Sequence, residues 1–285
     1  MKSRHLLPIT ILALLAALGK GQATLLLYDP FAYSTGDTLG SNNWNLVASS
    51  GGVATSVVAQ NLSAPGFSPS SGNAVKLLPN GQDWYRTYAT QSYESSSNAS
   101  LYYSFLLRVD NLGSLDTTGG FFGGLASPTG TSGAAMIGLR LSGSGFQIGM
   151  AKRDTSALSF DSTVFSVGST ILVVGSYNLV SGSIQNDTAS LWINPIDLGQ
   201  PNAPGASLTA STTGINNDVQ SFSSFVWKPQ GGAGSTQIPA SLIVDEIRVG
   251  NSWAEVTPVP EPHTLGMALL GAAGLLHSLR KRRRV

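Results

Sequence analysis

Histidine and cysteine are almost missing from this sequence, and their scarcity excludes several chemistries. There is no cysteine, and the three histidines are His5, His263 and His277. The stretch Thr24–Pro258 therefore lacks the base of a Ser–His–Asp or Cys–His nucleophile system, the soft and imidazole ligands of a zinc site, and any disulfide. No GxxxxGK[ST] or GxGxxG motif opens a helix, so a nucleotide site is not indicated either.

Charged residues are also scarce, at 11% of the chain, and they are unevenly spread. Between Thr24 and Pro258 there are 8 Lys and Arg residues and 14 Asp and Glu residues, which gives this region a net charge of −6, although the whole chain carries +1. An acidic domain has no electrostatic footprint for nucleic acid, so no such partner is expected.

The N-terminus has the three parts of a secretory signal peptide. Lys2 and Arg4 precede the apolar run Leu6–Leu18, and small residues, Gly21 and Ala23, occupy the −3 and −1 positions of a cleavage site. The pattern predicts that signal peptidase removes residues 1–23. The alternative is an uncleaved anchor, but the apolar run is shorter than the ~20 residues that a spanning helix needs.

The remaining region is rich in Gly, Ser, Thr, Asn and Val, which disfavours helices and favours strands joined by tight turns. In Ser100–Asp110, side chains alternate, with Tyr103 and Phe105 on one face and Tyr102 and Ser104 on the other. Residues 134–153 read as a hairpin around a Ser-Gly-Ser-Gly turn.

Further strands are expected at Ile171–Leu179, Thr188–Pro195, Ser221–Pro229 and Ala240–Gly250, whereas Pro201–Gly214 is expected to be a loop. Many strands at this spacing predict an all-β, two-sheet antiparallel jelly-roll sandwich spanning residues 24–258 as one domain.

Carboxylates are the acid–base groups that remain. Glycoside hydrolysis needs two of them flanking one bond. The close pair in a predicted strand is Asp245–Glu246, and adjacent strand residues are expected to point to opposite faces. Glu94 and Glu255 are isolated. No catalytic residue is assigned; a hydrolase or lyase that uses carboxylates from different strands is retained as an alternative.

Asn and Asp clusters are candidates for a calcium site, because calcium takes oxygen ligands in loops. The candidates are Asp187, which follows Asn186, and Asn217 and Asp218, which follow Asn216. These residues also form turns without any metal, and that interpretation is favoured. No other cofactor is expected.

Aromatic residues suggest a glycan-binding surface if they are exposed, since they could stack on sugar rings, or a sandwich core if they are buried. The candidates are Trp44, Trp84, Tyr85, Tyr88, Trp192, Trp227 and Trp253.

Three blocks resemble concanavalin A-like, laminin-G-like secreted domains. They are Asp245–Trp253 with Val256–Pro258, Leu191–Pro195, and Leu26–Tyr33. The resemblance implies a two-sheet jelly roll. It implies no single activity, because that fold hosts lectins, hydrolases and adhesion modules. The Glu-x-Asp-x-(x)-Glu strand of the hydrolase branch is absent.

The C-terminus, residues 259–285, resembles the PEP-CTERM sorting signal, a segment also labelled as an ice-binding-protein C-terminal domain. Its motif is Val259, Pro260, Glu261 and Pro262; an apolar helix is expected at 264–279; the basic stop is Arg280, Lys281, Arg282, Arg283 and Arg284. The resemblance implies recognition by exosortase, a membrane transpeptidase-like enzyme of bacteria that make exopolysaccharide. A short core helix with a basic end is the alternative.

Together these patterns predict an exported bacterial protein, transiently anchored in the inner membrane by its tail and then sorted to the cell surface or the extracellular space. The expected role of its domain is non-catalytic: binding polysaccharide, or forming part of the matrix or envelope. A purely structural module without ligand is the other alternative.

Overall fold

The computed structural model describes residues 25–48, 50–92, 98–182, 185–211, 218–219, 221–229 and 235–260. The expected signal peptide with Gly21 and Ala23, the calcium candidate Asn217, and the tail from Glu261 onward lie outside these residues. Within the described part of the chain, no helix is long and apolar enough to cross a membrane.

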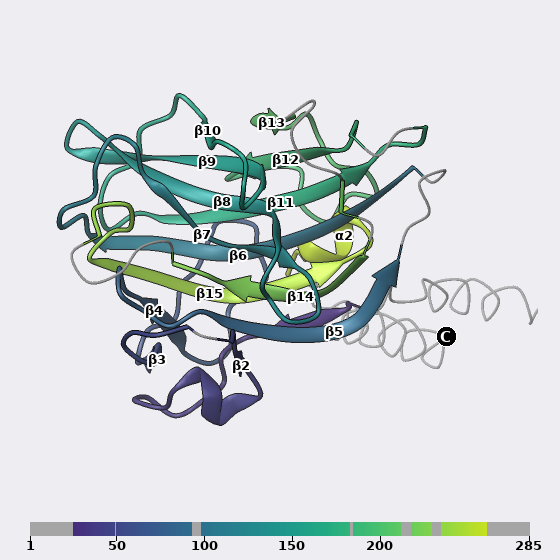
Figure 1. The fold of residues 1–285 in the computed structure, drawn as a ribbon. Coiled ribbons are helices and arrows are strands. Elements are labelled where there is room, and N and C mark those ends of the chain that lie inside the picture. Colours follow the sequence, from purple (N-terminus) through teal and green to yellow (C-terminus); the bar gives the residue numbers. More distant parts are fainter. Residues whose placement is uncertain are drawn as a thin grey trace, which may run out of the picture.

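Two antiparallel sheets form the domain, as the sequence predicts, and their strands cross the view of Figure 1 in two layers. The eight-stranded sheet has the order β13 (Leu208–Ala210), β12 (Thr188–Ile193), β11 (Thr170–Leu179), β6 (Ala99–Asn111), β15 (Ser241–Gly250), β4 (Ala74–Leu77) and β3 (Ser56–Val58), with β1 (Leu27–Asp29) also paired to β15. The seven-stranded sheet has the order β10 (Ser159–Phe160), β9 (Gly145–Arg153), β8 (Gly133–Ser142), β7 (Gly120–Ala126), β14 (Ser221–Trp227), β5 (Trp84–Ser92) and β2 (Asn45–Leu46).

The core lies between the sheets and is rich in aromatic rings. Tyr103 and Phe105 of β6 meet Phe225 and Trp227 of β14, with ring centroids 5.5 Å apart for Tyr103–Phe225 and 5.2 Å apart for Phe105–Trp227. The alternation predicted in β6 is confirmed for this face. Burying such rings stabilises a domain that has no disulfide.

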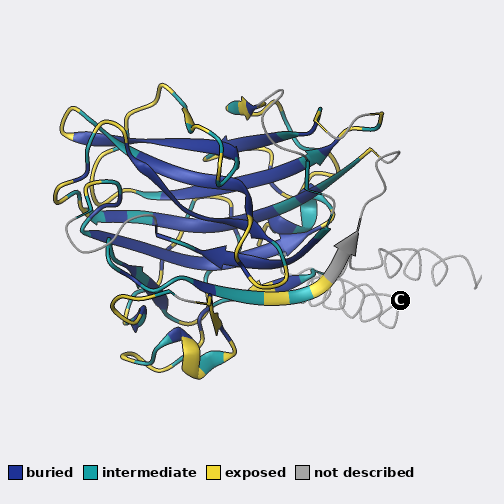
Figure 2. Cartoon of the chain, viewed as in Figure 1, coloured by how far each residue is buried: buried dark blue, intermediate teal, exposed yellow. Residues whose placement is uncertain are grey.

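The outer face of the eight-stranded sheet is buried as well, which alternation alone does not predict. Leu106, Leu172 and Ile243 point away from the core and pack against loops and the short helix α2 (Trp253–Val256). Figure 2 shows the strands mostly buried and the connecting loops mostly exposed. The Glu255 carboxylate accepts the backbone N–H groups of Asn251 (2.6 Å) and Ser252 (3.1 Å), so this isolated glutamate holds the turn into α2.

The predicted hairpin is confirmed: β8 ends at Ser142, β9 begins at Gly145, and these two residues pair. Gly143 has φ +59°, which the tight turn requires. Three other elements were not anticipated. The expected loop Pro201–Gly214 contains the edge strand β13, and the glycine-rich β7 lies in the middle of its sheet. The third is a short 3-10 helix, η1, which spans Leu39–Asn42.

Candidate functional site

All five tryptophans are buried. None is more than 8% exposed, and Trp227 packs in the aromatic core. Three others donate a hydrogen bond from the indole Nε1 inside the domain: Trp44 to Asp29 Oδ2 (2.9 Å), Trp192 to the Pro204 carbonyl (2.9 Å) and Trp253 to the Asp197 carbonyl (2.8 Å). Tyr85 and Tyr88 are partly exposed. The core interpretation is therefore correct for the tryptophans, and they form no platform for sugar rings.

The prediction that Asp245 and Glu246 point to opposite faces is wrong. The pairing of β15 with β6 shifts register between Asp245 and Arg248, and Glu246 has φ +54°. This bulge inserts an extra residue, so that Val244 and Ile247 both face the core while the two carboxylates between them share the outer face.

This carboxylate pair fastens a covering loop to the sheet. Asp245 Oδ2 accepts the Leu62 N–H at 2.9 Å, and Glu246 Oε1 accepts the Ser71 N–H at 2.8 Å. Glu246 Oε2 also accepts Arg248 Nη2 at 2.9 Å. Both acidic residues are 0% exposed, so no substrate reaches them in this arrangement. Burial raises the pKa of Asp245 to about 7.

Two of the calcium candidates, Asp187 and Asp218, come together around a lysine. Asp218 Oδ2 accepts the backbone N–H groups of Asn186 (2.9 Å) and Asp187 (3.1 Å), and Asp218 Oδ1 forms an ion pair with buried Lys152. An ammonium group thus supplies the positive charge that a cation would bring. Burial raises the pKa of Asp187. Among the described residues, no group of three or more His, Cys, Asp or Glu side chains could hold a metal ion.

A surface cleft that the sequence did not indicate lies on the outer face of the seven-stranded sheet. Gly138 of β8 and Gly149 of β9 pair directly. Residues 154–160, which we call the strap, run from the end of β9 into the edge strand β10, whose Phe160 pairs with Gly149. A Cβ on Gly138 would lie 2.6 Å from Leu158 Cδ1, and one on Gly149 would lie 2.6 Å from Phe160 Cδ1, so the two glycines make room for the side chains of the strap.

The polar cleft, beside the strap, has a volume of about 420 Å³. Its apolar wall is formed by Phe121, Leu158 and Phe160, and its polar groups include Asp154 and Gln237. The size and the mixed lining suit a small organic ligand with both apolar faces and hydroxyl groups. Glycines at facing positions of the predicted 134–153 hairpin were the signal in the sequence that something packs closely on this face.

Arg140 fixes the far end of the strap. Its guanidinium carbon lies 4.3 Å from the centre of the Phe160 ring, and its Nε donates to Gln147 Oε1 at 2.9 Å. Gln147 Nε2 in turn donates to the backbone carbonyl of Ser162 at 3.1 Å. The ring that lines the polar cleft is therefore held in place by a cation–π contact and a hydrogen-bonded partner.

A charged group borders the polar cleft. Lys228 follows β14, and its Nζ lies 3.3 Å from Asp154 Oδ2. Asp83 precedes Trp84, which pairs with Trp227, so Asp83 stands across from Lys228. Burial raises the pKa of Asp83 to about 6, while the Lys228 charge lowers it. Asp83 lies just before β5 and Asp154 just after β9.

Of the predicted sorting motif, the structure describes Val259 and Pro260, both exposed. They follow α2 on the outer face of the eight-stranded sheet, where Ser68 N donates to the Pro258 carbonyl at 2.9 Å.

The fold and the polar cleft define a two-sheet antiparallel β-sandwich with a ligand-sized surface site. No family model matches the chain, and no curated protein matches it. Similar solved structures include an endo-β-1,4-glucuronan lyase from the fungus Trichoderma reesei (13% identity, TM-score 0.45, covering 83% of this chain and 100% of that one). Others are the alginate lyase Aly36B (13%, 0.45, 79% and 96%) and the cellulose-induced protein Cip1 (12%, 0.43, 79% and 97%). The similarity is one of fold.

Proposed function

We propose that this chain is an exported, surface-sorted and non-catalytic β-sandwich protein that binds polysaccharide in the polar cleft. The observation that carries the proposal is the lining of that cleft. Apolar rings stand next to carboxylate, amide and hydroxyl groups, and a sugar offers C–H faces to the former and hydroxyls to the latter.

The buried carboxylates support the non-catalytic part of the proposal. Asp29, Asp245 and Glu246 are at most 2% exposed, and each accepts several hydrogen bonds from the domain itself. A glycosidase needs two carboxyl groups that reach the scissile bond. Because these three carboxylates stabilise loops and strands, they are not available to act on a glycosidic bond.

The delivery route belongs to the same proposal. Signal peptidase cuts after Ala23, the tail holds the chain transiently in the inner membrane, and an exosortase-type enzyme recognises the motif around Glu261. The acidic domain then reaches the cell surface or the extracellular matrix. Calcium, offered by Asp187, Asn217 and Asp218 in the sequence, is not required by this route.

A glycan array probed with residues 24–260, with and without calcium, tests the binding. The bound glycan is then titrated against Phe160→Ala, which removes one of the two phenylalanine rings from the wall of the polar cleft. We expect an affinity loss of about tenfold, equivalent to about 1.4 kcal/mol. Val164→Ala is the matched control, because Val164 is an exposed apolar residue that does not line this cleft. Equal affinity of both variants and the parent would reject the cleft as the binding site.

One observation favours a second candidate, an enzyme of polysaccharide breakdown. Asp154 lines the polar cleft and forms an ion pair with Lys228, and the Lys228 charge also acts on Asp83, whose pKa is raised to about 6, so two carboxylates from separate parts of the chain interact with one lysine. If this candidate is correct, the parent chain shortens the glycan that it binds, and Asp83→Asn abolishes shortening without abolishing binding.

A further inference from the structure

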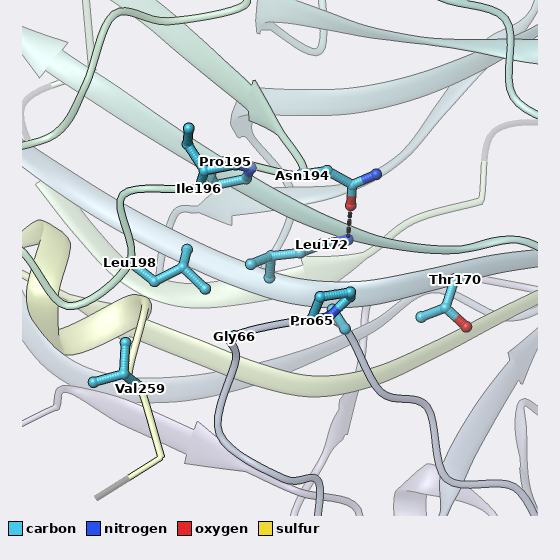
Figure 3. A pocket seen from close by; sticks show the side chains of 10 residues that line it. Pro65, Gly66, Thr170, Leu172, Asn194, Pro195, Ile196, Leu198 and Val259 are labelled. Carbon is cyan, nitrogen blue, oxygen red and sulfur yellow. Dashed lines mark hydrogen bonds between the residues drawn. The ribbon is translucent and has the colours of Figure 1, made fainter. Parts of the chain in front are cut away.

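A second hollow, of about 640 Å³, lies on the outer face of the eight-stranded sheet, and we call it the apolar pocket. Leu172 of β11 lies at its floor, and loops carrying Pro65, Ile196 and Leu198 surround it together with Val259 (Figure 3). None of the ten residues that line it is charged. It is therefore unlike the polar cleft, which is lined by Asp154 and bordered by Lys228.

The rim of the apolar pocket presents Ile196 to solvent. This side chain is 91% exposed, the highest value among the exposed large hydrophobic residues of the described chain. Asn194 has φ +47°; its Oδ1 accepts the Leu172 N–H at 2.8 Å, and its own N–H donates to the Leu172 carbonyl at 2.9 Å. Asn194 thus ends the pairing of β12 with β11 and turns the chain outward, and Ile196 follows two residues later.

Val259 completes the rim of the apolar pocket. Thr257 Oγ1 accepts the Gly199 N–H at 3.2 Å and donates to the Trp253 carbonyl at 2.8 Å. A Cβ on Gly199 would lie 3.2 Å from a Val259 methyl group, so the valine packs directly on that glycine. Val259 is consequently fixed beside the apolar pocket (Figure 3).

The length of the tail determines how far this rim can stand from a membrane. Only Pro260–Thr264 separate Val259 from Leu265, where the apolar run begins, and an extended chain of that length spans about 20 Å. The run Leu265–Leu279 would be about 22 Å long as a helix, against a hydrocarbon core of about 30 Å. A short anchor draws its flanking residues toward the headgroups.

We propose that the rim of the apolar pocket, with Ile196 and Val259 as its contacts, docks on the surface of a lipid bilayer while the tail is inserted. This inference rests on the membrane-tethered stage of the proposed function. The uncharged lining of the pocket suits the boundary between headgroups and acyl chains, while the exposed carboxylate of Asp197, between Ile196 and Leu198, would stay among the headgroups. Because the domain carries −6, the favoured surface is zwitterionic rather than anionic. The tether supplies a high local concentration, so two apolar side chains suffice.

Hydrogen–deuterium exchange on the full chain in phosphatidylcholine vesicles tests the docking without any label. We expect amides in residues 194–198 and 64–66 to exchange at least threefold more slowly than in the lipid-free chain, while the β8–β9 turn at Ser144 stays unchanged. Ile196→Ser should remove the protection. Equal exchange with and without vesicles would overturn the docking. Slow exchange already in the lipid-free chain would also overturn it, and would indicate that the tail of the chain or a second copy covers the pocket.

A polarity-sensitive fluorophore gives a second measurement, because the chain has no native cysteine to compete for the label. Labels are placed at Ser63→Cys, an exposed residue next to the pocket-lining residues 64–66, and, as a control, at Ser144→Cys, an exposed residue in the β8–β9 turn. A lipid-borne quencher should reduce emission at position 63 at least twice as strongly as at 144. An alkaline wash that releases the chain overturns tether and docking together, whereas a retained chain with equal quenching overturns docking alone.

Discussion

At the scale of single residues, the buried acidic side chains of this domain hold loops and strands together through hydrogen bonds and ion pairs. Asp29 accepts the Phe31 N–H (2.9 Å), the Tyr33 hydroxyl (2.7 Å) and Trp44 Nε1 (2.9 Å), and forms an ion pair with Arg86 of the opposite sheet. Asp245 and Glu246 hold the loop over the other face. Each buried charge is compensated by several donors, which is the condition for keeping it inside a protein.

Asp245 gives a pH-dependent prediction. Its pKa of about 7 in the folded domain exceeds the ~3.9 of an unfolded chain, so the folded state binds this proton more tightly. The contribution to stability is therefore full below about pH 4 and is lost as the pH rises toward 7. Asp245→Asn should flatten this decline, and it should lower the free energy of unfolding at pH 4 by roughly 1–3 kcal/mol, because an amide N–H₂ then faces a backbone N–H.

Urea unfolding of the domain at pH 4, 5, 6 and 7 measures this effect. Asp197→Asn is the control, since Asp197 is an exposed acidic residue. A residual slope is expected from Asp83 and Asp187, whose pKa values burial also raises. An unchanged pH slope in Asp245→Asn would contradict the assignment.

At the scale of elements, regular alternation predicted most of the strands and failed where the backbone departs from it. The inward face of β6 and the β8–β9 hairpin follow the two-residue period. Asp245–Glu246 does not, because a bulge is set by the pairing partners and by φ +54° at Glu246, and neither is visible in the local sequence. The polar cleft escaped prediction for a similar reason, since it depends on where the strap lies rather than on a motif.

The strap gives a prediction at this scale. Gly149→Val places a side chain where Phe160 and the Ser159 carbonyl lie, so the strap must lift from the sheet. We expect glycan binding to fall at least tenfold while the sandwich core stays folded, as measured by near-UV circular dichroism and a binding titration. The control is Gly205→Ala, because nothing lies within 4 Å of a Cβ at Gly205. Undiminished glycan binding by the Gly149→Val variant would contradict a role of the strap in the binding site.

At the scale of the whole molecule, charge is divided between a domain of −6 and a basic end. On the proposed delivery route, this distribution would place the basic cluster on the cytoplasmic side of a membrane and the acidic domain outside. The composition predicted this division directly, whereas the residues that line the two hollows required the packed structure.

The tail gives the prediction for this scale. Replacing Glu261 by Ala, or deleting Arg280–Arg284, should leave most of the protein in the membrane fraction or missorted, as measured by cell fractionation and immunoblotting in the native host. Asp161→Ala, a change at a partly exposed acidic residue that lines neither hollow, serves as the control. Normal release of the tail variants would contradict the sorting role.

The central claim is that the domain holds polysaccharide without cleaving it. The most direct measurement is to incubate residues 24–260 with the glycan that they retain on the array, and then to determine the chain length of that glycan by size-exclusion chromatography. Binding with an unchanged glycan length is the predicted result. A progressive shortening of the glycan, or no retained glycan at all, would contradict the claim.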